Sequence, residues 1–282
     1  MKQVFGVLGH PIEHSLSPIM HEAIYKEMQL DATYIPFLVE PAYLSDAIAG
    51  IRGLGLSGVN VTLPHKINVI PFLDELDEKA AVIGAVNTIV HDKTANKLIG
   101  FNTDGDGYVE SLLPMLTKPL TESRVLIIGS GGAARGVAVT LAMRGVSHMM
   151  IVNRTPQKAQ ELAQVCSKWS DSVGSGLEKA QSKLTAFDVI INTTSLGMKP
   201  YESEMPMSLE ALSQTTVVSD LIYTPSKTRF LLEAEKRGAT IHNGLGMFIN
   251  QGALAFYKWT GKQAPRDVME LAVKRKLNEM GK

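Results

Sequence analysis

The stretch that decides the fold is residues 124–145, RVLIIGSGGAARGVAVTLAMRG. Residues 125–128 form an uninterrupted apolar run, which is typical of a strand buried on both faces. The glycines at 129, 131 and 132 then break the strand, and a long helix rich in small and apolar residues follows them. A strand joined to a helix by a glycine turn predicts a βαβ unit with a parallel sheet.

The glycine turn also has the spacing of a nucleotide site. Gly129, Gly131 and Ala134 fit the pattern G-x-G-x-x-G/A. In that pattern the first glycine allows the tight turn, the second lets the backbone approach a pyrophosphate, and the small third residue lets the helix pack on the strand. The free amides at the helix start then bind the anion. A tight turn without a ligand is the alternative, and the strand-turn-helix context favours the nucleotide.

The end of the next strand indicates which nucleotide is bound. NAD enzymes usually place Asp or Glu there, about 20 residues after the glycines, to bond the ribose 2′-hydroxyl. This chain instead has Asn153, Arg154 and Thr155, with Lys158 one turn later. A carboxylate would repel a 2′-phosphate, whereas a guanidinium can grip it with a planar fork. A solvated arginine at a strand end is the alternative, but together with the glycine loop the pattern favours NADP.

A third loop, NTTSLGM at residues 192–198, follows a predicted strand that ends near residue 191. Its small polar residues, Thr194 among them, suit a backbone that lies beside a dinucleotide. An ordinary loop explains the same composition equally well, so this loop alone does not decide for a cofactor.

The rest of the chain extends the α/β pattern. Before residue 102, segments with strand and helix periodicity alternate, which predicts a second α/β unit with a mainly parallel sheet. Residues 88–91 and 98–101 predict an added antiparallel pair joined through DKTANK. We therefore expect an α/β protein of two domains, one of them Rossmann-like, divided near residues 103–122. Residues 247–260 and 265–280 are helical, and their pattern assigns them to neither unit.

Composition narrows the class of protein. The 282 residues are 45% hydrophobic and 20% charged, with 28 basic and 28 acidic side chains. Such a chain is globular and has no net field to attract nucleic acid or a membrane surface. The single cysteine, Cys166, excludes an internal disulfide and fits a reducing compartment, and the first residues do not resemble a signal peptide, so we expect a cytoplasmic protein. No clustering of His, Cys and Asp suggests a metal site.

Two serines near the N-terminus precede a predicted helix. In HSLSP, Ser17 comes directly before a proline, which is typical of a helix N-cap. Capping accounts for Ser17 but leaves Ser15 unexplained. Two hydroxyls beside a helix N-terminus would also form a neutral site for a carboxylate.

Polar residues collect at predicted strand ends in the first unit. Asn60, Thr62 and Lys66 lie on or just past one strand, Asn87 starts another, and Asp104 lies where the two units join. Open α/β sheets bind ligands at such ends. Lys66 lies between a proline turn and the apolar residues Ile67, Val69 and Ile70, so we expect an enclosed cation. A Lys–Asp pair could move a proton, although spacing alone favours a structural salt bridge.

Taken in order, these motifs carry a family resemblance. GHPIEHSLSP, GVNVTLPHK, GAVNT, GFNTDGDG, GSGGAAR, NRTPQK, NTTSLGM, DLIYTP and NGLGMFINQGALAF occur along nearly the whole chain. The sequence resembles the shikimate dehydrogenases of the shikimate/quinate dehydrogenase family. The resemblance implies reversible, NADPH-dependent reduction of 3-dehydroshikimate to shikimate, a step of chorismate and aromatic amino acid biosynthesis.

The resemblance also implies roles for the residues of the first unit. Ser15 and Ser17 would hold the substrate carboxylate with help from Tyr223, and Lys66, paired with Asp104, would be the acid/base at the C3 oxygen. The ring hydroxyls would be bound by Asn60, Thr62, Asn87, Asp104 and Gln251.

On the cofactor side, the family implies that residues 129–133 (Gly129, Ser130, Gly131, Gly132 and Ala133) hold the pyrophosphate. Asn153, Arg154, Thr155 and Lys158 would hold the adenosine ribose and its phosphate, with Leu221, Gly244 and Met247 near the nicotinamide and Glu78 a further candidate. The C-terminal helices would return to the first domain. The expected domains are 1–104 with 241–282 for the substrate, and 105–240 for NADP.

Two rival functions stay open. One is a quinate/shikimate dehydrogenase of broader cofactor specificity, against which Arg154 argues. The other is a non-catalytic dinucleotide sensor, which would not need both Lys66 and Asp104. The sequence does not decide between a monomer and a homodimer.

Overall fold

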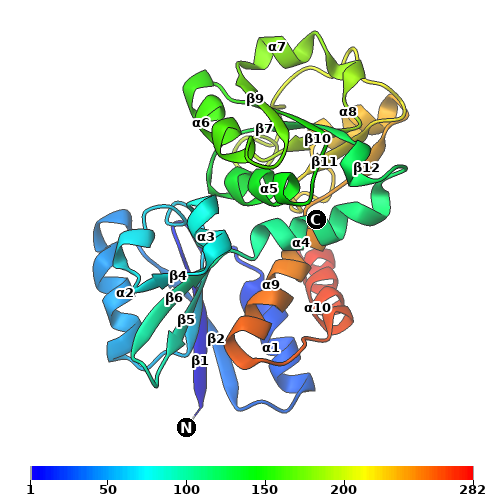
Figure 1. The fold of residues 1–282 in the computed structure, drawn as a ribbon. Helices are drawn as coiled ribbons and strands as arrows, with labels where there is room; N and C mark the ends of the chain where they lie inside the picture. Colours follow the sequence, from blue (N-terminus) through cyan, green and yellow to red (C-terminus); the bar gives the residue numbers. More distant parts are fainter. Residues whose placement is uncertain (1, 282) are drawn as a thin grey trace. The chain divides into compact units, whose positions relative to one another are not determined.

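The computed structural model describes residues 2–281 and divides them into two compact units (Figure 1). The first ends at Asp104 and resumes with Ile249–Gly281, and the second is Gly105–Phe248. The sequence placed the second boundary at residue 241 rather than 249. The difference arises because the intervening residues pack on the second unit. The Phe248 ring stacks on Tyr223 at a centroid distance of 4.6 Å, and Gly246 lies against the Ser111 side chain.

The second unit is built on a doubly wound parallel sheet. Its strands are β7 (Arg124–Ile128), β8 (His148–Val152), β9 (Asp171–Ser175), β10 (Val189–Asn192), β11 (Val217–Asp220) and β12 (Thr240–His242). Their order is β12-β11-β10-β7-β8-β9, and every neighbouring pair is parallel. This is the Rossmann order, so the predicted fold class is confirmed. The strand order reverses between β7 and β10, and ligands bind at such a reversal, outside the carboxyl ends of the strands.

Helices and short 3-10 turns precede and connect these strands. They are α4 (Asp104–Leu112), Leu113–Met115, Leu120–Glu122, α5 (Gly132–Met143), α6 (Pro156–Cys166), α7 (Leu177–Gln181), Leu184–Ala186 and α8 (Arg229–Lys236). Val125 to Ile128 are all buried, as predicted for a strand covered on both faces. Sequence patterns missed β9, whose residues DSVGS have no apolar run, and β12, which is only three residues long. Pairing with β8 and β11 makes these segments strands.

The first unit has a mixed sheet. Its strands are β1 (Gln3–Gly9), β2 (Ala32–Leu38), β3 (Gly58–Val61), β4 (Glu75–Leu76), β5 (Thr88–Asp92) and β6 (Lys97–Phe101), in the order β2-β1-β3-β5-β6-β4. β1 is parallel to β2 and β3, and β4 is parallel to β6. β5 is antiparallel to β3 and β6. The predicted parallel sheet with an added antiparallel pair is therefore confirmed.

Helices from both ends of the chain pack together in the first unit. The helices and 3-10 turns here are α1 (Ser17–Glu27), Pro41–Tyr43, α2 (Leu44–Gly53), Ile70–Phe72, α3 (Glu78–Ile83), α9 (Leu245–Thr260) and α10 (Arg266–Glu279). α10 packs on α1 (Figure 1). Gly252 of α9 lies against Met20 of α1. The Trp259 indole donates a hydrogen bond to the Ile89 carbonyl at 2.9 Å, which ties α9 to β5. No helix within residues 2–281 is long and apolar enough to cross a membrane.

Gly174 of β9 offers a test of the packing between β9 and α6. A Cβ at this position would overlap with the backbone of Ala159 and Gln160 in α6. Because backbone cannot rotate away as a side chain can, we expect Gly174→Ala to lower the free energy of unfolding by about 1–3 kcal/mol in urea titrations.

The matched control is Gly50→Ala in α2, where the nearest atom to an added Cβ is 4.0 Å away. There we expect an unfolding free energy higher by about 0.5–1 kcal/mol, because alanine is the better helix former. If Gly174→Ala were as stable as Gly50→Ala, the close approach of α6 and β9 would be contradicted.

Candidate active site

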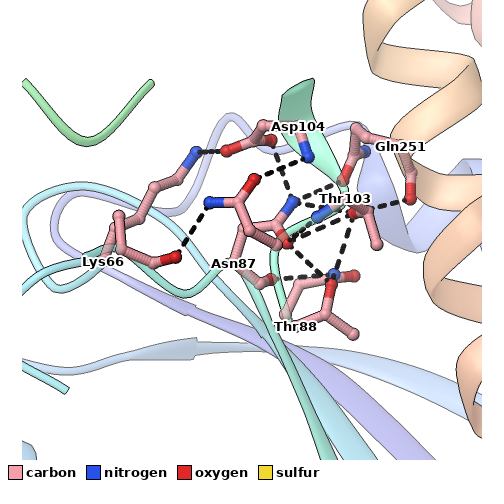
Figure 2. Close-up of polar contacts among 9 residues, drawn as sticks. Lys66, Asn87, Thr88, Thr103, Asp104 and Gln251 are labelled. Atoms are coloured by element: carbon pink, nitrogen blue, oxygen red, sulfur yellow. Dashed lines mark hydrogen bonds and ion pairs between the residues drawn. The ribbon is translucent and has the colours of Figure 1, made fainter. Parts of the chain in front are cut away.

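Lys66 lies in the loop after β3, and backbone bonds fix its position. The Lys66 carbonyl accepts from the Val86 N–H at 2.7 Å, and the neighbouring His65 ring bonds the Val39 carbonyl at 2.7 Å. The Lys66 Nζ donates to Asp104 Oδ2 at 2.6 Å. Figure 2 shows the two side chains pointing toward one another. The two side chains are only 14% and 5% exposed. The sequence predicted an enclosed cation and a Lys–Asp pair, and this geometry confirms both.

The amide of Asn87 joins this pair to its surroundings (Figure 2). Nδ2 donates to Asp104 Oδ1 and to Thr103 Oγ1, both at 2.9 Å. Oδ1 accepts from the Thr103 N–H at 2.8 Å and from the Thr88 hydroxyl at 3.0 Å. Asn87 is 2% exposed, so its orientation is fixed by these buried bonds. Both oxygens of the Asp104 carboxylate are therefore hydrogen-bonded, Oδ2 to Lys66 and Oδ1 to Asn87.

Gln251 reaches the same cluster from α9. Its backbone carbonyl accepts from the Thr103 hydroxyl at 3.0 Å, and its Oε1 lies 3.5 Å from Asn87 Nδ2. The structure therefore brings together Lys66, Asn87, Asp104 and Gln251 as the resemblance implied. Sequence reasoning missed Thr103, although its place between Asn102 and Asp104 in GFNTDGDG could have drawn attention to it.

Asn60 lies beside this cluster, but most of its hydrogen-bonding capacity is already used in bonds to other residues of the protein. Its Nδ2 donates to the Asn87 carbonyl and to the Thr88 hydroxyl, each at 3.1 Å. Its Oδ1 accepts from the Tyr34 hydroxyl at 2.7 Å. Both amide hydrogens are thus used, and only the second lone pair of Oδ1 is left for a ligand. Tyr34, which sequence reasoning did not single out, is buried and stacks on His21 at 4.4 Å.

The serine pair is arranged differently from the sequence prediction. α1 begins at Ser17, Leu16 occupies the N-cap position, and no side chain caps the helix. The Ser15 hydroxyl accepts from the Ser17 N–H at 3.3 Å instead. The prediction that Ser17 caps the helix was wrong, because the helical turn starts one residue earlier than the proline suggests. Ser15 rather than Ser17 therefore has the local structural role.

The two remaining candidates of the first unit are Thr62 and Glu78. Thr62 follows β3, is half-buried, and donates its N–H to the Leu8 carbonyl at 2.9 Å. Glu78 is the exposed first residue of α3, a helix that Asp77 caps through the Lys79 N–H.

In the second unit the glycine loop has the geometry that its sequence predicted. Gly129 has φ +117°, its N–H donates to the Val152 carbonyl at 2.8 Å, and a Cβ there would overlap with the Thr193 hydroxyl. Gly131 occupies the N-cap of α5, where an added Cβ meets no atom within 4 Å. Ala134 is fully buried. The open approach to the Gly131 backbone and the α5 amides fits a pyrophosphate.

The loop after β8 carries exposed basic and polar groups. Arg154, Thr155 and Lys158 are exposed, and the Asn153 amide donates to the Thr155 carbonyl at 3.2 Å. Thr155 precedes α6, so Lys158 lies in the first turn of that helix. The position where NAD enzymes usually carry a carboxylate is therefore occupied by amide, hydroxyl and cationic groups, which fit a 2′-phosphate.

The other cofactor candidates also follow carboxyl ends of strands. Thr194 bonds Asn192 Oδ1 through its N–H at 3.0 Å and its hydroxyl at 2.7 Å. Gly244 lies so close to the Leu221 carbonyl that a Cβ would overlap with it, and Met247 is buried three residues later. Tyr223 belongs to this unit too, and burial raises the pKa of its hydroxyl.

Three family models match the chain. The model of the shikimate dehydrogenase substrate binding domain matches residues 7–89, and that of shikimate / quinate 5-dehydrogenase matches residues 111–222. The model of the shikimate 5′-dehydrogenase C-terminal domain matches residues 244–274. These ranges include Lys66, the glycine loop and Gln251.

Individual proteins are similar over nearly the whole length. The NADP(+) shikimate dehydrogenase of Geobacillus sp. (strain WCH70) is 51% identical over 93% of this chain and 94% of its own. A crystal structure of a shikimate dehydrogenase in complex with NADP+ is 42% identical, with a TM-score of 0.89, over 98% of this chain and 96% of its own. The shikimate 5-dehydrogenase of Thermus thermophilus, in complex with NADP(H) and shikimate, is 36% identical, with a TM-score of 0.86, over 97% and 99%.

Asn87→Asp tests the hydrogen-bond cluster. The substitution puts an oxygen in place of Nδ2, which now donates to Asp104 Oδ1 across 2.9 Å. Two carboxylates in contact repel, so we expect the unfolding free energy at pH 8 to fall by about 2–4 kcal/mol in denaturant titrations. At pH 5 we expect a smaller loss, because a shared proton would relieve the repulsion.

Asn68→Asp, the same change at an exposed position of the neighbouring loop, is the matched control, and we expect little effect at either pH. Equal stability losses in the two variants would mean that Asn87 does not face Asp104 in solution.

Proposed function

This chain belongs to the shikimate/quinate dehydrogenase family, and on that premise we propose that it is an NADP-dependent shikimate dehydrogenase. The reaction is the reversible reduction of 3-dehydroshikimate to shikimate, a step of chorismate and aromatic amino acid biosynthesis. Among the structural observations, the buried contact of Lys66 with Asp104 at 2.6 Å carries the proposal, because it supplies a held proton donor.

Lys66 is the acid/base of the proposed reaction. When bound, NADPH supplies the hydride from C4 of its nicotinamide ring to the ketone carbon. The Lys66 ammonium donates a proton to the C3 oxygen as that oxygen gains negative charge, and in the reverse direction the neutral amine accepts it. Asp104 holds the ammonium through Oδ2, while Asn87 holds the other oxygen of Asp104. The carboxylate therefore cannot turn away from Lys66 without breaking a buried bond.

The substrate, in this proposal, is bound by the polar groups around that pair. Asn60, Thr62, Asn87, Asp104 and Gln251 bond the ring hydroxyls, and Ser15 and Ser17 hold the carboxylate with Tyr223. The support for the set is chemical: amides, hydroxyls and one carboxylate suit a polyhydroxylated acid. For Asn60 the available group is an acceptor lone pair, because both its hydrogens are used internally.

The cofactor residues are proposed on the same basis. The turn from Gly129 to Ala133 binds the pyrophosphate at the start of α5, and Asn153, Arg154, Thr155 and Lys158 bind the adenosine ribose and its 2′-phosphate. Thr194, Leu221, Gly244 and Met247 lie near the nicotinamide. Glu78 is retained as a candidate of the first unit, exposed at the start of α3.

Two features of the working enzyme complete the proposal. The lone, buried Cys166 supports a reducing, cytoplasmic setting. A homodimer stays a prediction that the protein mass in solution, measured by light scattering, will test.

The experiment that tests the function is an initial-rate assay of nicotinamide reduction by the purified protein. Shikimate and quinate are each combined with NADP+ and with NAD+. We expect turnover confined to shikimate with NADP+. Comparable rates with quinate or NAD+ would favour a dehydrogenase of broader specificity, and NADP+ binding without any turnover would favour the dinucleotide sensor.

Lys66→Ala tests the proton donor. Turnover should fall by about 10²-fold or more, the usual scale for an acid/base group, while NADP+ binding stays intact. The control is Lys93→Ala, which removes an exposed lysine that bonds the Gly55 carbonyl in the same unit. Unchanged turnover in Lys66→Ala would remove the role proposed for this residue.

Arg154→Ala tests whether this residue distinguishes NADP+ from NAD+. In this proposal the guanidinium grips the 2′-phosphate, which NAD+ lacks. The KM for NADP+ should therefore rise by about tenfold or more, the scale of a charge-assisted bond, while that for NAD+ changes little. Arg124→Ala is the control, because Arg124 begins β7 and so lies at the amino ends of the strands, away from the loop after β8. Equal weakening of both cofactors would mean that Arg154 does not select the phosphate.

A further inference from the structure

A buried carboxylate lies outside the residues assigned so far. Asp220 is the last residue of β11 and is 0% exposed. Its oxygens accept from the Asn192 amide at 3.2 Å, the Ile222 N–H at 3.0 Å and the Thr228 hydroxyl at 2.8 Å. These donors are all neutral, and burial raises the pKa of Asp220 to about 6 although the hydrogen bonds oppose that shift. Burying a carboxylate among neutral donors costs free energy, so a purely packing role would be met better by an apolar side chain.

The Asn192 amide, the first of these donors, fixes the conformation of the loop after β10. The Asn192 Nδ2 that bonds Asp220 also donates to the Leu196 carbonyl at 3.1 Å. The opposite atom, Oδ1, accepts both bonds from Thr194. Only Nδ2 can donate to a carboxylate, so Asp220 helps to fix the orientation of the Asn192 amide, together with Leu196 and Thr194. Through that amide it fixes the backbone at Thr194.

The other two donors control the turn after β11. Ile222 lies between Leu221 and Tyr223, two candidate site residues. The hydrogen bond from its N–H to Asp220 therefore fixes the backbone next to both of them. Thr228 is the N-cap of α8, and its hydroxyl accepts a hydrogen bond from the Leu231 N–H at 3.3 Å, which fixes the far end of the turn.

The two loops also touch one another. Gly197 has φ +108°, and a Cβ there would lie 3.0 Å from Thr228 Cβ. The loop after β10 therefore packs directly on the residue that ends the turn after β11. One carboxylate thus holds both loops.

We propose that Asp220 is a positioning residue of the cofactor site, whose carboxylate sets the two loops that hold the nicotinamide half of NADP. The inference rests on the proposed function. The adenosine half is bound by the loop after β8, and the strands β7 and β10 separate β8 from β11 in the sheet. Loss of the Asp220 carboxylate should therefore weaken one half of the cofactor site and spare the other.

Asp220→Asn tests this division. The variant keeps the size of the side chain but replaces one acceptor oxygen by an amide NH2 group, which is a donor and cannot accept from Asn192 Nδ2. By calorimetry we expect the Kd for NADP+ to rise about tenfold, the scale of one lost buried hydrogen bond. The Kd for adenosine 2′,5′-bisphosphate, which lacks the nicotinamide half, should not change. Intact binding of this second ligand also verifies that the variant folds.

Two further variants make the test sharper. Asp188→Asn is the matched control. Asp188 precedes β10, at the amino ends of the strands, and its carboxylate accepts a hydrogen bond from the Arg124 N–H at 2.7 Å. It should leave both Kd values unchanged. The double variant Asp220→Asn with Asn192→Asp restores a carboxylate facing an amide, and we expect it to recover part of the NADP+ affinity.

The outcomes separate the two proposals. Equal weakening of both ligands in Asp220→Asn, or no weakening of either, would overturn the positioning role. No recovery in the double variant would overturn the claim that Asp220 acts through the Asn192 amide. A wild-type protein that binds neither ligand would overturn the proposed function itself, and the role of Asp220 with it.

Discussion

The buried ion pair of Lys66 and Asp104 is the interaction on which the first unit depends. Removing two charges from water is costly, and their attraction repays that cost only when every remaining polar atom is satisfied. Here Asp104 gives one oxygen to Lys66 and the other to Asn87, and its own N–H donates to Asn102 at 3.1 Å. Asp104 is also the first residue of α4, where the helix dipole favours a negative charge. The pair is thus held in one geometry.

That requirement explains why segments far apart in sequence meet at one place. Lys66 comes from the loop after β3, Asn87 from the start of β5, Asp104 from the start of α4 and Gln251 from α9. Asn87 links two of the other segments, since it contacts Thr103 and Asp104 at the start of α4 and the Gln251 side chain of α9. A proton donor that moves little during a reaction needs such support, because misplacement of the donor reduces the rate steeply.

In the second unit the loops of the candidate cofactor site are positioned in a different way. All of its strands are parallel, so their carboxyl ends lie along one edge and deliver the loops of the cofactor candidates to the same side. Close backbone approaches hold these loops: Gly129 against Thr193, Gly244 against Leu221, and Gly197 against Thr228. Asp220 adds one buried carboxylate at the centre of the last two loops. The loops of the second unit are therefore positioned by close contacts at glycines and by one buried carboxylate, whereas the site of the first unit is positioned by many side-chain hydrogen bonds.

The sequence by itself determined the α/β class, the strand and helix of the glycine loop, and the enclosure of the Lys66 cation. These follow from local patterns, because apolar periodicity, glycine spacing and a charge enclosed by apolar residues are written in short stretches of chain. Only the tertiary structure decided that β9 and β12 are strands, that Ser15 rather than Ser17 makes the local bond before α1, and that Asn60 is occupied by Tyr34, Asn87 and Thr88. Each of these depends on a partner distant in sequence or on the exact start of a helix. Local patterns contain no information about such partners, because backbone pairing and buried hydrogen bonds form only once the chain has folded.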